Sequence, residues 1–571
     1  MSYLGRYTIS SMFSPFNARE SWVRKTLLAI LVVSAILRIG WIARGDTVND
    51  EVFLGFRAVG LLDFDEAGKQ TTPIEWWDPA PPWWTRLSFH DHPPLVFLIQ
   101  HLSITVFGEN TVGLRLPSAL FGVASVYLVF LLGVLLYSPR AGLIAAGLLS
   151  VTLNHVYISR VGMQESFVIF FLLLSSYLFL RAVHADHSFV LAGVAVGLAL
   201  LTKYNAVVLV PLFGVYLLLH HRAAFKRKDL WLSVAVAALV FSPVIIYNIM
   251  LYHAVGHFDF QFSYVFGQNP AVWPEAPGKE TGTLLERAGD FFPRLVSSHS
   301  WLFLLLAAIS LVFLRNAFVV TALASLLLLI AVIGPAYRFL TMLTPFLALS
   351  IGNWLAPIAE KKKLLLVFLS AVALFEIVYS VNNQIAHYPK GPTPWLSSKV
   401  RYENYNWGNN ELGEFFKKEF ARKVPAATFE MRYSFIERAQ DASIVRGTRK
   451  GYASYPALII THGNFDRGAK LWVLDRLQIY HGWPIVDLET YFDYLKERGA
   501  DYYAREGFRT YYFVVSTNIV PSPEFVPLVR GIEPVSIKNP RGDEVFLIYR
   551  LERRPGGART LSRSSQALSQ D

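Results

Sequence analysis

Acidic and imidazole side chains lie in two clusters close to the first apolar segment of this chain. Asp50 and Glu51 follow the apolar run at 26–43, and a His-Asp-His-Pro-Pro element comes later, with Asp91 and His92 at its centre. Such groups are costly beside a membrane unless chemistry needs them. A carboxylate in this place could accept the proton of an incoming hydroxyl or amine.

Isolated basic residues near the ends of later apolar runs extend this set. Arg115, Arg160, Lys203 and Arg338 are the basic members. Several cations from different turns would suit a reaction on a lipid-linked phosphate, because they stabilise the phosphate as it leaves. Further Asp, Glu and His side chains nearby could also hold a divalent metal that serves the same leaving group.

The composition excludes an ordinary soluble protein. Of the 571 residues, 53% are hydrophobic and only 17% are charged, and the mean hydropathy is +0.37. The net charge of +11 comes mainly from short loops between apolar runs, which the positive-inside rule explains better than nucleic-acid binding. Cysteine is absent, so disulfides and thiol chemistry are excluded. No cleavable signal peptide is evident, and we expect the first apolar run to remain as a span.

The apolar runs predict a membrane protein of about 11 transmembrane helices with its N-terminus inside. Basic clusters flanking the spans then fall on the inner side. The run at 95–107 is too short to cross a bilayer, and we expect it to be a helix at the outer surface. The predicted spans are 26–43, 115–137, 140–158, 165–183, 188–203, 205–220, 230–252, 299–315, 317–335, 339–357 and 364–381.

The pattern also predicts how the chain is divided. Residues 1–381 form the transmembrane part, with a first outer loop at 44–114, and residues 382–552 form an extracytoplasmic α/β domain. A polar, Ser-rich tail at 553–571 is predicted to be disordered. Alternating strands and helices in the domain indicate a largely parallel sheet. Strands are expected at 457–461, 471–474, 510–516 and 545–551, and helices at 411–420 and 490–498.

An ordered series of short motifs resembles the polyprenyl-phosphate-sugar-dependent glycosyltransferases of the GT-C fold, in particular the protein O-mannosyltransferases and the lipid A aminoarabinose transferases. The series covers roughly residues 25–380, and its order is more specific than any one member. It comprises Asp50-Glu51, a His-Pro-Pro-Leu element from His92, Phe107-Gly108-Glu109, Leu114-Arg115-Leu116-Pro117-Ser118, Ser159-Arg160, Leu200-Leu201-Thr202-Lys203 and Tyr337-Arg338-Phe339-Leu340.

The resemblance implies roles for individual residues. Asp50 matches the catalytic base and Glu51 a supporting acid. Asp91 matches an acidic position near the metal, and His92 a basic position beside the donor phosphate. Glu165 stands in the second outer loop, where an Asp is more usual. The resemblance also implies direct displacement with inversion at the anomeric carbon.

Simpler interpretations remain for each feature. Asp50 and Glu51 could cap a helix, and Arg115 could anchor a span at the headgroups. The aromatic run at 76–84 suits an interface anchor better than a platform that stacks on sugars. Transfer of a phosphate-containing group, or transport of a lipid-linked sugar, is an alternative to glycosyl transfer. The expected location is the plasma (inner) membrane, with an acceptor protein, lipid or glycan as partner and no nucleic acid.

Overall fold

The computed structural model describes most of the chain. The described residues are 18–47, 50–59, 82–88, 92–184, 187–268, 283–361, 363–386, 390–400, 407–428, 434–465, 467–553 and 559–560. Contacts divide the chain into two units. The helical unit comprises Met1–Arg44, Arg57–Trp76 and Pro81–Tyr402, and the C-terminal unit comprises Gly45–Phe56, Trp77–Ala80 and Glu403–Asp571.

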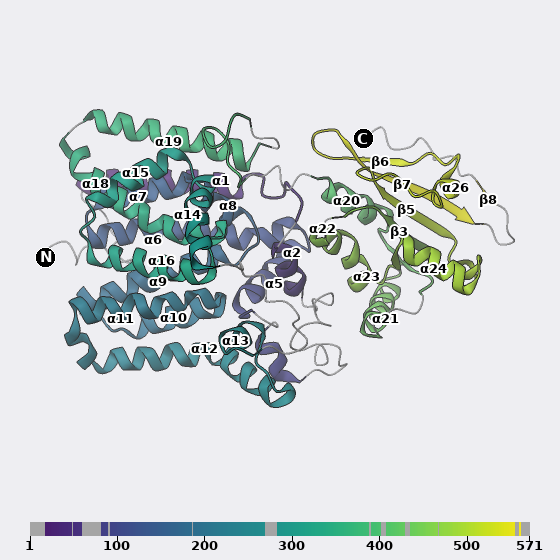
Figure 1. Ribbon diagram of the computed structural model, residues 1–571, viewed down its shortest axis with the longest axis horizontal. Coiled ribbons are helices and arrows are strands. Elements are labelled where there is room, and N and C mark those ends of the chain that lie inside the picture. Colours follow the sequence, from purple (N-terminus) through teal and green to yellow (C-terminus); the bar gives the residue numbers. More distant parts are fainter. Residues whose placement is uncertain are drawn as a thin grey trace. The chain divides into compact units, whose positions relative to one another are not determined.

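The helical unit consists of apolar helices, many of which lie side by side (Figure 1). Helix α2 (Asp50–Ala58) begins in the C-terminal unit and ends in this one. The other elements are α1 (Ala18–Ile39), η2 (Trp83–Leu87), α5 (Leu95–Phe107), α6 (Thr111–Leu136), α7 (Pro139–Val151), α8 (Leu153–Arg160), α9 (Glu165–His184), α10 (Val190–Thr202), η3 (Tyr204–Val208), α11 (Leu209–His220), η4 (Arg222–Lys226), α12 (Lys228–Val255), α13 (Phe260–Val265), α14 (Leu284–Ser298), α15 (Trp301–Val312), α16 (Ala317–Ile333), α17 (Tyr337–Leu340), η5 (Thr341–Leu343), α18 (Thr344–Lys361) and α19 (Lys363–Gln384).

Each predicted span falls on one helix or on consecutive helices. Among the described residues, five helices are long and apolar enough to cross a membrane, and the bent pair α7–α8 would make a sixth. Others, including α10, α15 and α16, are apolar but shorter. The chain is thus an integral membrane protein by its helices, while the total of about 11 spans and their orientation stay predictions. The run at 95–107 is helical, as expected.

Small residues allow the helices to approach closely. A Cβ atom on Gly133 of α6 would lie 2.4 Å from Cα of Gly142 in α7. A Cβ atom on Gly193 of α10 would likewise meet the backbone of Ser233 in α12. Helices packed in lipid rely on such contacts, because hydrocarbon gives no hydrophobic drive for helix association. Glycine is therefore required at both crossings.

The break between α7 and α8 leaves carbonyl groups without partners inside the helix. The two helices meet at an angle of 59°. Arg38 of α1 donates to the carbonyl oxygens of Leu149 (3.1 Å) and Ser150 (2.7 Å), and Ser380 of α19 donates to that of Val151 (2.5 Å). Unpaired polar groups at a helix end are costly when they are buried. The two side chains therefore stabilise the bend from neighbouring helices.

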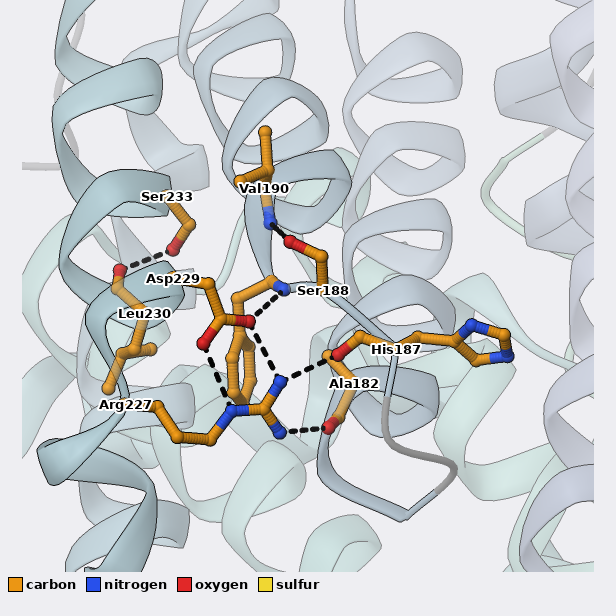
Figure 2. Close-up of polar contacts among 9 residues, drawn as sticks. Ala182, His187, Ser188, Val190, Arg227, Asp229, Leu230 and Ser233 are labelled. Carbon is orange, nitrogen blue, oxygen red and sulfur yellow. Dashed lines mark hydrogen bonds and ion pairs between the residues drawn. The ribbon is translucent and has the colours of Figure 1, made fainter.

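A second arginine stabilises the turn between α9 and α10 (Figure 2). Arg227 donates from Nε (3.0 Å) and from a terminal nitrogen (2.8 Å) to the two carboxylate oxygens of Asp229. It also donates to the carbonyl oxygens of Ala182 (2.9 Å) and His187 (2.8 Å). A planar guanidinium suits this two-point contact with a carboxylate. The start of α12 is thereby fixed to the end of α9.

The C-terminal unit is an α/β domain with one main sheet (Figure 1). Its strands run in the order β4-β3-β5-β7-β6, and β8 pairs with the C-terminal end of β7. The elements are α20 (Asn409–Glu419), β1 (Lys423–Pro425), α21 (Ser434–Arg449), β2 (Ala453–Tyr455), β3 (Ala457–His462), α22 (Arg467–Lys470), η7 (Leu471–Asp475), α23 (Arg476–His481), β4 (Ile485–Asp487), α24 (Leu488–Arg498), α25 (Tyr502–Arg505), β5 (Thr510–Ser516), α26 (Val526–Val529), β6 (Val535–Lys538), β7 (Glu544–Arg553) and β8 (Arg559–Thr560).

Two details of the predicted domain are wrong. The sheet is mixed, because β3 pairs in parallel with β4 and β5 whereas β5, β6 and β8 join their neighbour β7 in antiparallel fashion. The apolar run at 471–474 is a π-helical turn between α22 and α23 instead of a strand. A short apolar run does not by itself distinguish a strand from a buried helix. The expected strands near β3, β5 and β7 and the helices α20 and α24 are confirmed.

Candidate active site

Three of the predicted site residues meet in the helical unit. Nζ of Lys203 lies 2.6 Å from Oε1 of Glu165, and Nε of Arg338 lies 3.7 Å from the same oxygen. The Glu165 side chain is buried, with 2% exposed, while Lys203 and Arg338 expose 15% and 28% of theirs. These three residues are called the ion cluster below.

Each residue of the ion cluster stands where a helix begins or ends. Glu165 is the first residue of α9, where a negative charge interacts favourably with the helix dipole. Lys203 has extended backbone angles between α10 and η3. Arg338 lies in the short helix α17, which follows Gly334 at φ +91° after the end of α16. These interruptions bring charged side chains from three separate segments together.

The ion cluster carries one more positive charge than negative. The aromatic ring of Phe339 lies next to both cations, 5.5 Å from Nζ of Lys203 and 5.1 Å from Cζ of Arg338. An aromatic face at this distance attracts a cation and excludes water. A partly exposed group with excess positive charge is suited to bind an anion.

His92 is held by an arginine that the sequence did not mark as a site residue. A terminal nitrogen of Arg57 lies 3.0 Å from Nδ1 of His92, and the guanidinium lies over the ring of Phe97 at 5.8 Å. Arginine can only donate, so Nδ1 accepts and the neutral imidazole carries its proton on Nε2. The Nε2–H of His92 is then a donor. Arg57 is almost fully buried, with 3% exposed.

Arg115 and Arg160 donate to backbone carbonyl groups at the C-terminal end of α1 and in the residues that follow it. Arg160 donates to the oxygens of Leu37 (2.7 Å) and Gly40 (2.8 Å), and Arg115 donates to that of Arg44 (2.8 Å). Both arginines are buried. Cations at a helix C-terminus stabilise its unpaired carbonyl groups. These contacts fix the segment that leads along the chain to Asp46 and Asp50, and a contact with a donor phosphate stays a prediction.

The acidic pair lies at the start of α2. Asp50 and Glu51 occupy its first turn, a position that favours negative charge. Glu51 is buried, with 1% exposed, and Asp50 is half-buried. The third predicted acidic residue, Asp91, lies outside the described residues.

A different carboxylate, Asp46, anchors the same segment within the C-terminal unit. Oδ2 accepts from the backbone N–H groups of Trp407 (2.7 Å) and Gly408 (3.1 Å), and Oδ1 accepts from that of Asn410 (2.8 Å). The side-chain amide of Asn409 donates a fourth bond at 3.2 Å. Burial raises the pKa of the Asp46 carboxyl, while these donors act in the opposite direction. Asp46 thereby ties the segment Gly45–Phe56 to the start of α20.

A buried polar network in the helical unit was missed from the sequence. The side-chain nitrogen of Asn154 in α8 lies 2.5 Å from Nε2 of His299 and 3.0 Å from the hydroxyl of Thr344. All three residues are buried. The network joins the C-terminal half of the broken helix to α18. No spacing in the sequence marks it, because its members lie 145 and 190 positions apart.

Two other expectations concern the metal and the aromatic run. Within the described part of the chain, no group of three or more His, Asp or Glu residues could hold a metal ion. Oε1 of Glu165 is paired with Lys203, and a metal held by Glu165 and Asp91 stays a prediction. Trp84 is buried against Tyr247 at a ring distance of 6.0 Å and is therefore not an interface anchor, whereas Trp83 is 65% exposed and its anchor role stays a prediction. Residues 76–81 of the run lie outside the described residues.

Comparisons of sequence identify relatives over part of the chain. The sequence profile of the dolichyl-phosphate-mannose-protein mannosyltransferases matches residues 91–247. Two Bacillus subtilis (strain 168) proteins whose names class them as mannosyltransferases are also similar. YkcB is 29% identical over 226 residues, 37% of this chain and 29% of that protein. YycA is 26% identical over 275 residues, 46% of this chain and 35% of that protein. The chain thus matches about a third of the length of these relatives.

The comparison of folds covers almost the whole chain. The crystal structure of ArnT from Cupriavidus metallidurans bound to undecaprenyl phosphate matches with a TM-score of 0.51 and 12% identity. The match covers 93% of this chain and 98% of that one. The resemblance recognised from the ordered motifs is confirmed, and the fold of this chain is that of the GT-C glycosyltransferases.

Proposed function

We propose that this protein is a membrane glycosyltransferase that moves a sugar from a polyprenyl-phosphate-linked donor to an acceptor hydroxyl or amine. The observation that carries the proposal is the ion cluster, in which Lys203 and Arg338 surround Glu165 with excess positive charge. Lys203 and Arg338 belong to motifs in the ordered series that resembles the GT-C enzymes, and Glu165 stands in the second outer loop, where an Asp is more usual. The undecaprenyl phosphate named for ArnT is a ligand of the same class.

In the proposed reaction the acceptor oxygen or nitrogen attacks the anomeric carbon of the donor sugar. A new bond forms to that carbon, and the bond from the carbon to the phosphate oxygen breaks with inversion. The polyprenyl phosphate departs with the electron pair, and Asp50 takes the acceptor proton with Glu51 in support. Lys203 and Arg338 stabilise the charge that grows on the departing phosphate. The Nε2–H of His92 is a further donor to that phosphate.

Arg115 and Arg160 have a different place in this proposal. Both guanidinium groups already donate to carbonyl oxygens of the segment after α1. We expect both arginines to orient this segment. A contact with the donor phosphate would be a second role of the same side chains. A divalent metal held by Asp91 and Glu165 could supply further charge neutralisation, but the pairing of Glu165 with Lys203 favours a reaction in which protein cations suffice.

The products distinguish this reaction from transfer of a phosphate-containing group. Purified protein in nanodiscs is incubated with candidate polyprenyl-phosphate sugars and acceptors, and the lipid products are separated. Glycosyl transfer leaves polyprenyl phosphate, whereas transfer of a sugar phosphate leaves free polyprenol. Polyprenol as the product, or consumption of none of the donors, would reject the proposal. Parallel reactions with a chelator test the need for a metal.

The location of the reaction is part of the proposal. We place the ion cluster and the C-terminal unit on the extracytoplasmic side of the plasma membrane, because the basic loops then fall inside. A reporter fused after Lys228 is expected to give a cytoplasmic signal. An extracytoplasmic signal at this position would reverse the orientation.

A further inference from the structure

Helix α14 exposes large apolar side chains along one side. Leu284, Leu285, Phe292 and Val296 are 65%, 83%, 69% and 41% exposed. Leu285, Phe292 and Val296 are separated by seven and four positions, which places them on the same face of a helix. The exposed side chains therefore form a continuous apolar face.

The opposite side of α14 faces the protein with polar groups. Arg287 donates to the carbonyl oxygens of Ala331 and Val332 at the end of α16. Ser297 is buried and donates to the hydroxyl of Tyr337 at 3.4 Å. A helix on a protein surface in water has the reverse arrangement, with its apolar side packed inward. The arrangement in α14 requires an apolar medium outside.

The contact between Arg287 of α14 and the end of α16 indicates that the apolar medium outside α14 is lipid. Helix α16 has 17 residues without a charge, and its outer side chains Leu328 and Val332 are 63% and 64% exposed. A helix of this length rises about 25 Å and so ends close to the boundary of the hydrocarbon core. Arg287 fixes α14 at this end. The apolar face of α14 thus continues the lipid-exposed surface of α16.

We propose that α14 lies in the membrane–water interface with this face against the lipid acyl chains. A capping box between Thr283 and Glu286 defines its first turn, and the ion pair Asp290–Arg294 (2.9 Å) lies on the polar side. Interfacial helices have this combination of one apolar face and one charged face. The surface is independent of the reaction proposed above, because none of these residues belongs to the ion cluster.

The natural absence of cysteine allows a direct test. Single substitutions Leu285→Cys, Phe292→Cys and Val296→Cys, with Glu286→Cys and Asp290→Cys as matched controls, are spin-labelled in the full-length protein in phospholipid nanodiscs. Electron paramagnetic resonance then compares collisions with oxygen, which concentrates in lipid, and with a water-soluble nickel chelate. The first three labels are expected to favour oxygen at least threefold over the two controls, and a label at Leu328→Cys, one turn further into α16, should lie deeper.

Three results would overturn the proposal. Collisions with nickel at 285, 292 and 296 as frequent as at 290 would place the face in water. Low collisions with both reagents would place it against protein. Spin–spin broadening between labels would identify a second copy as the partner. A variant that does not fold is replaced by Ala288→Cys, which samples the same exposed face.

Discussion

Two buried carboxylates, one in each unit, are neutralised in opposite ways. Glu165 in the helical unit is met by the charged side chains of Lys203 and Arg338. Asp46 in the C-terminal unit is met by N–H groups at the start of α20 and by one amide side chain. Both are almost fully buried, with 2% and 1% exposed.

The difference separates a carboxylate that is paired with side-chain cations from one that is held by backbone N–H groups. Lysine and arginine side chains can rotate toward an incoming phosphate, whereas backbone N–H groups at a helix start are fixed in place. The first arrangement suits binding, and the second suits anchoring. Asp50, four positions after Asp46 and only half-buried, stands on the anchored segment as the proposed base.

The largest expected effect is the loss of transfer activity on substitution of Asp50, the proposed base, as opposed to Asp46, the anchoring carboxylate. Asp50→Asn removes the proton acceptor while preserving the size of the side chain, so the single-turnover rate of transfer should fall about 10²–10⁴-fold. Binding of polyprenyl phosphate and the thermal midpoint should be unchanged. Glu414→Gln, an exposed acid of α20, is the matched control. Full activity of Asp50→Asn would remove Asp50 from the mechanism.

The next effect concerns the cations of the ion cluster. Lys203→Ala and Arg338→Ala should each weaken binding of free polyprenyl phosphate about 10–100-fold, because each removes a charged hydrogen bond to the anion. Titration of the purified protein with free polyprenyl phosphate measures this binding separately from the chemical step. Lys417→Ala, on the exposed surface of α20, is the control.

The double variant Lys203→Met/Glu165→Gln tests whether Lys203 serves only to neutralise the buried charge of Glu165. If Lys203 only neutralises Glu165, removal of both charges should restore phosphate binding. If Lys203 binds the phosphate, affinity should stay low in the double variant. Restored binding would contradict the comparison drawn between Glu165 and Asp46.

The sequence predicted the helices well because long apolar runs carry their own signal. Every predicted span falls on helices, and the short run at 95–107 is a helix. Periodicity failed at 471–474, where four apolar residues form a π-helical turn. The direction of strand pairing depends on the connections between strands, so the antiparallel partners of β7 were also missed.

The candidate site was predicted by residue type but not by partner. Glu165, Lys203 and Arg338 were each identified as charges at span ends, and the structure brings them together across 38 and 173 positions of sequence. Arg57 was placed in the first outer loop without a role at the site, and Asp46 was not identified. Their partners are an imidazole and distant backbone N–H groups, which leave no pattern in the sequence. Arginines at helix ends that bind carbonyl groups, such as Arg160, look the same in sequence as arginines that bind phosphate.

The anchoring role of Asp46 predicts a local loss of stability. Asp46→Ala removes the acceptor of three backbone N–H groups, at a cost of about 2–3 kcal/mol. Hydrogen exchange in the full-length protein should show protection at Trp407–Asn410 falling about 30–160-fold, with β5 unaffected. Equal protection in the variant would show that α20 does not depend on Asp46.

The pH dependence of the same site has a definite sign. Burial raises the pKa of Asp46 in the folded state above its unfolded value. The contribution of this group to the free energy of unfolding is therefore fully present below the unfolded pKa and is lost as the pH rises through the folded pKa. Asp46→Asn should remove this part of the pH dependence. An unchanged profile would indicate that the four donors offset the effect of burial.

The smallest expected effect concerns Glu165 itself. In Glu165→Gln the carboxylate no longer competes with a phosphate for Lys203 and Arg338, so free polyprenyl phosphate should bind about 3–10-fold more tightly, a gain of roughly 1 kcal/mol. The amide oxygen of glutamine can still accept the hydrogen bond from Lys203, and the lysine should keep its position. Weaker binding than in the unmodified protein would show that Glu165 orients the cations instead of competing for them. Because Asp46→Asn leaves both cations in place, its phosphate affinity should not change, and this contrast separates an exchangeable anion from an anchoring one.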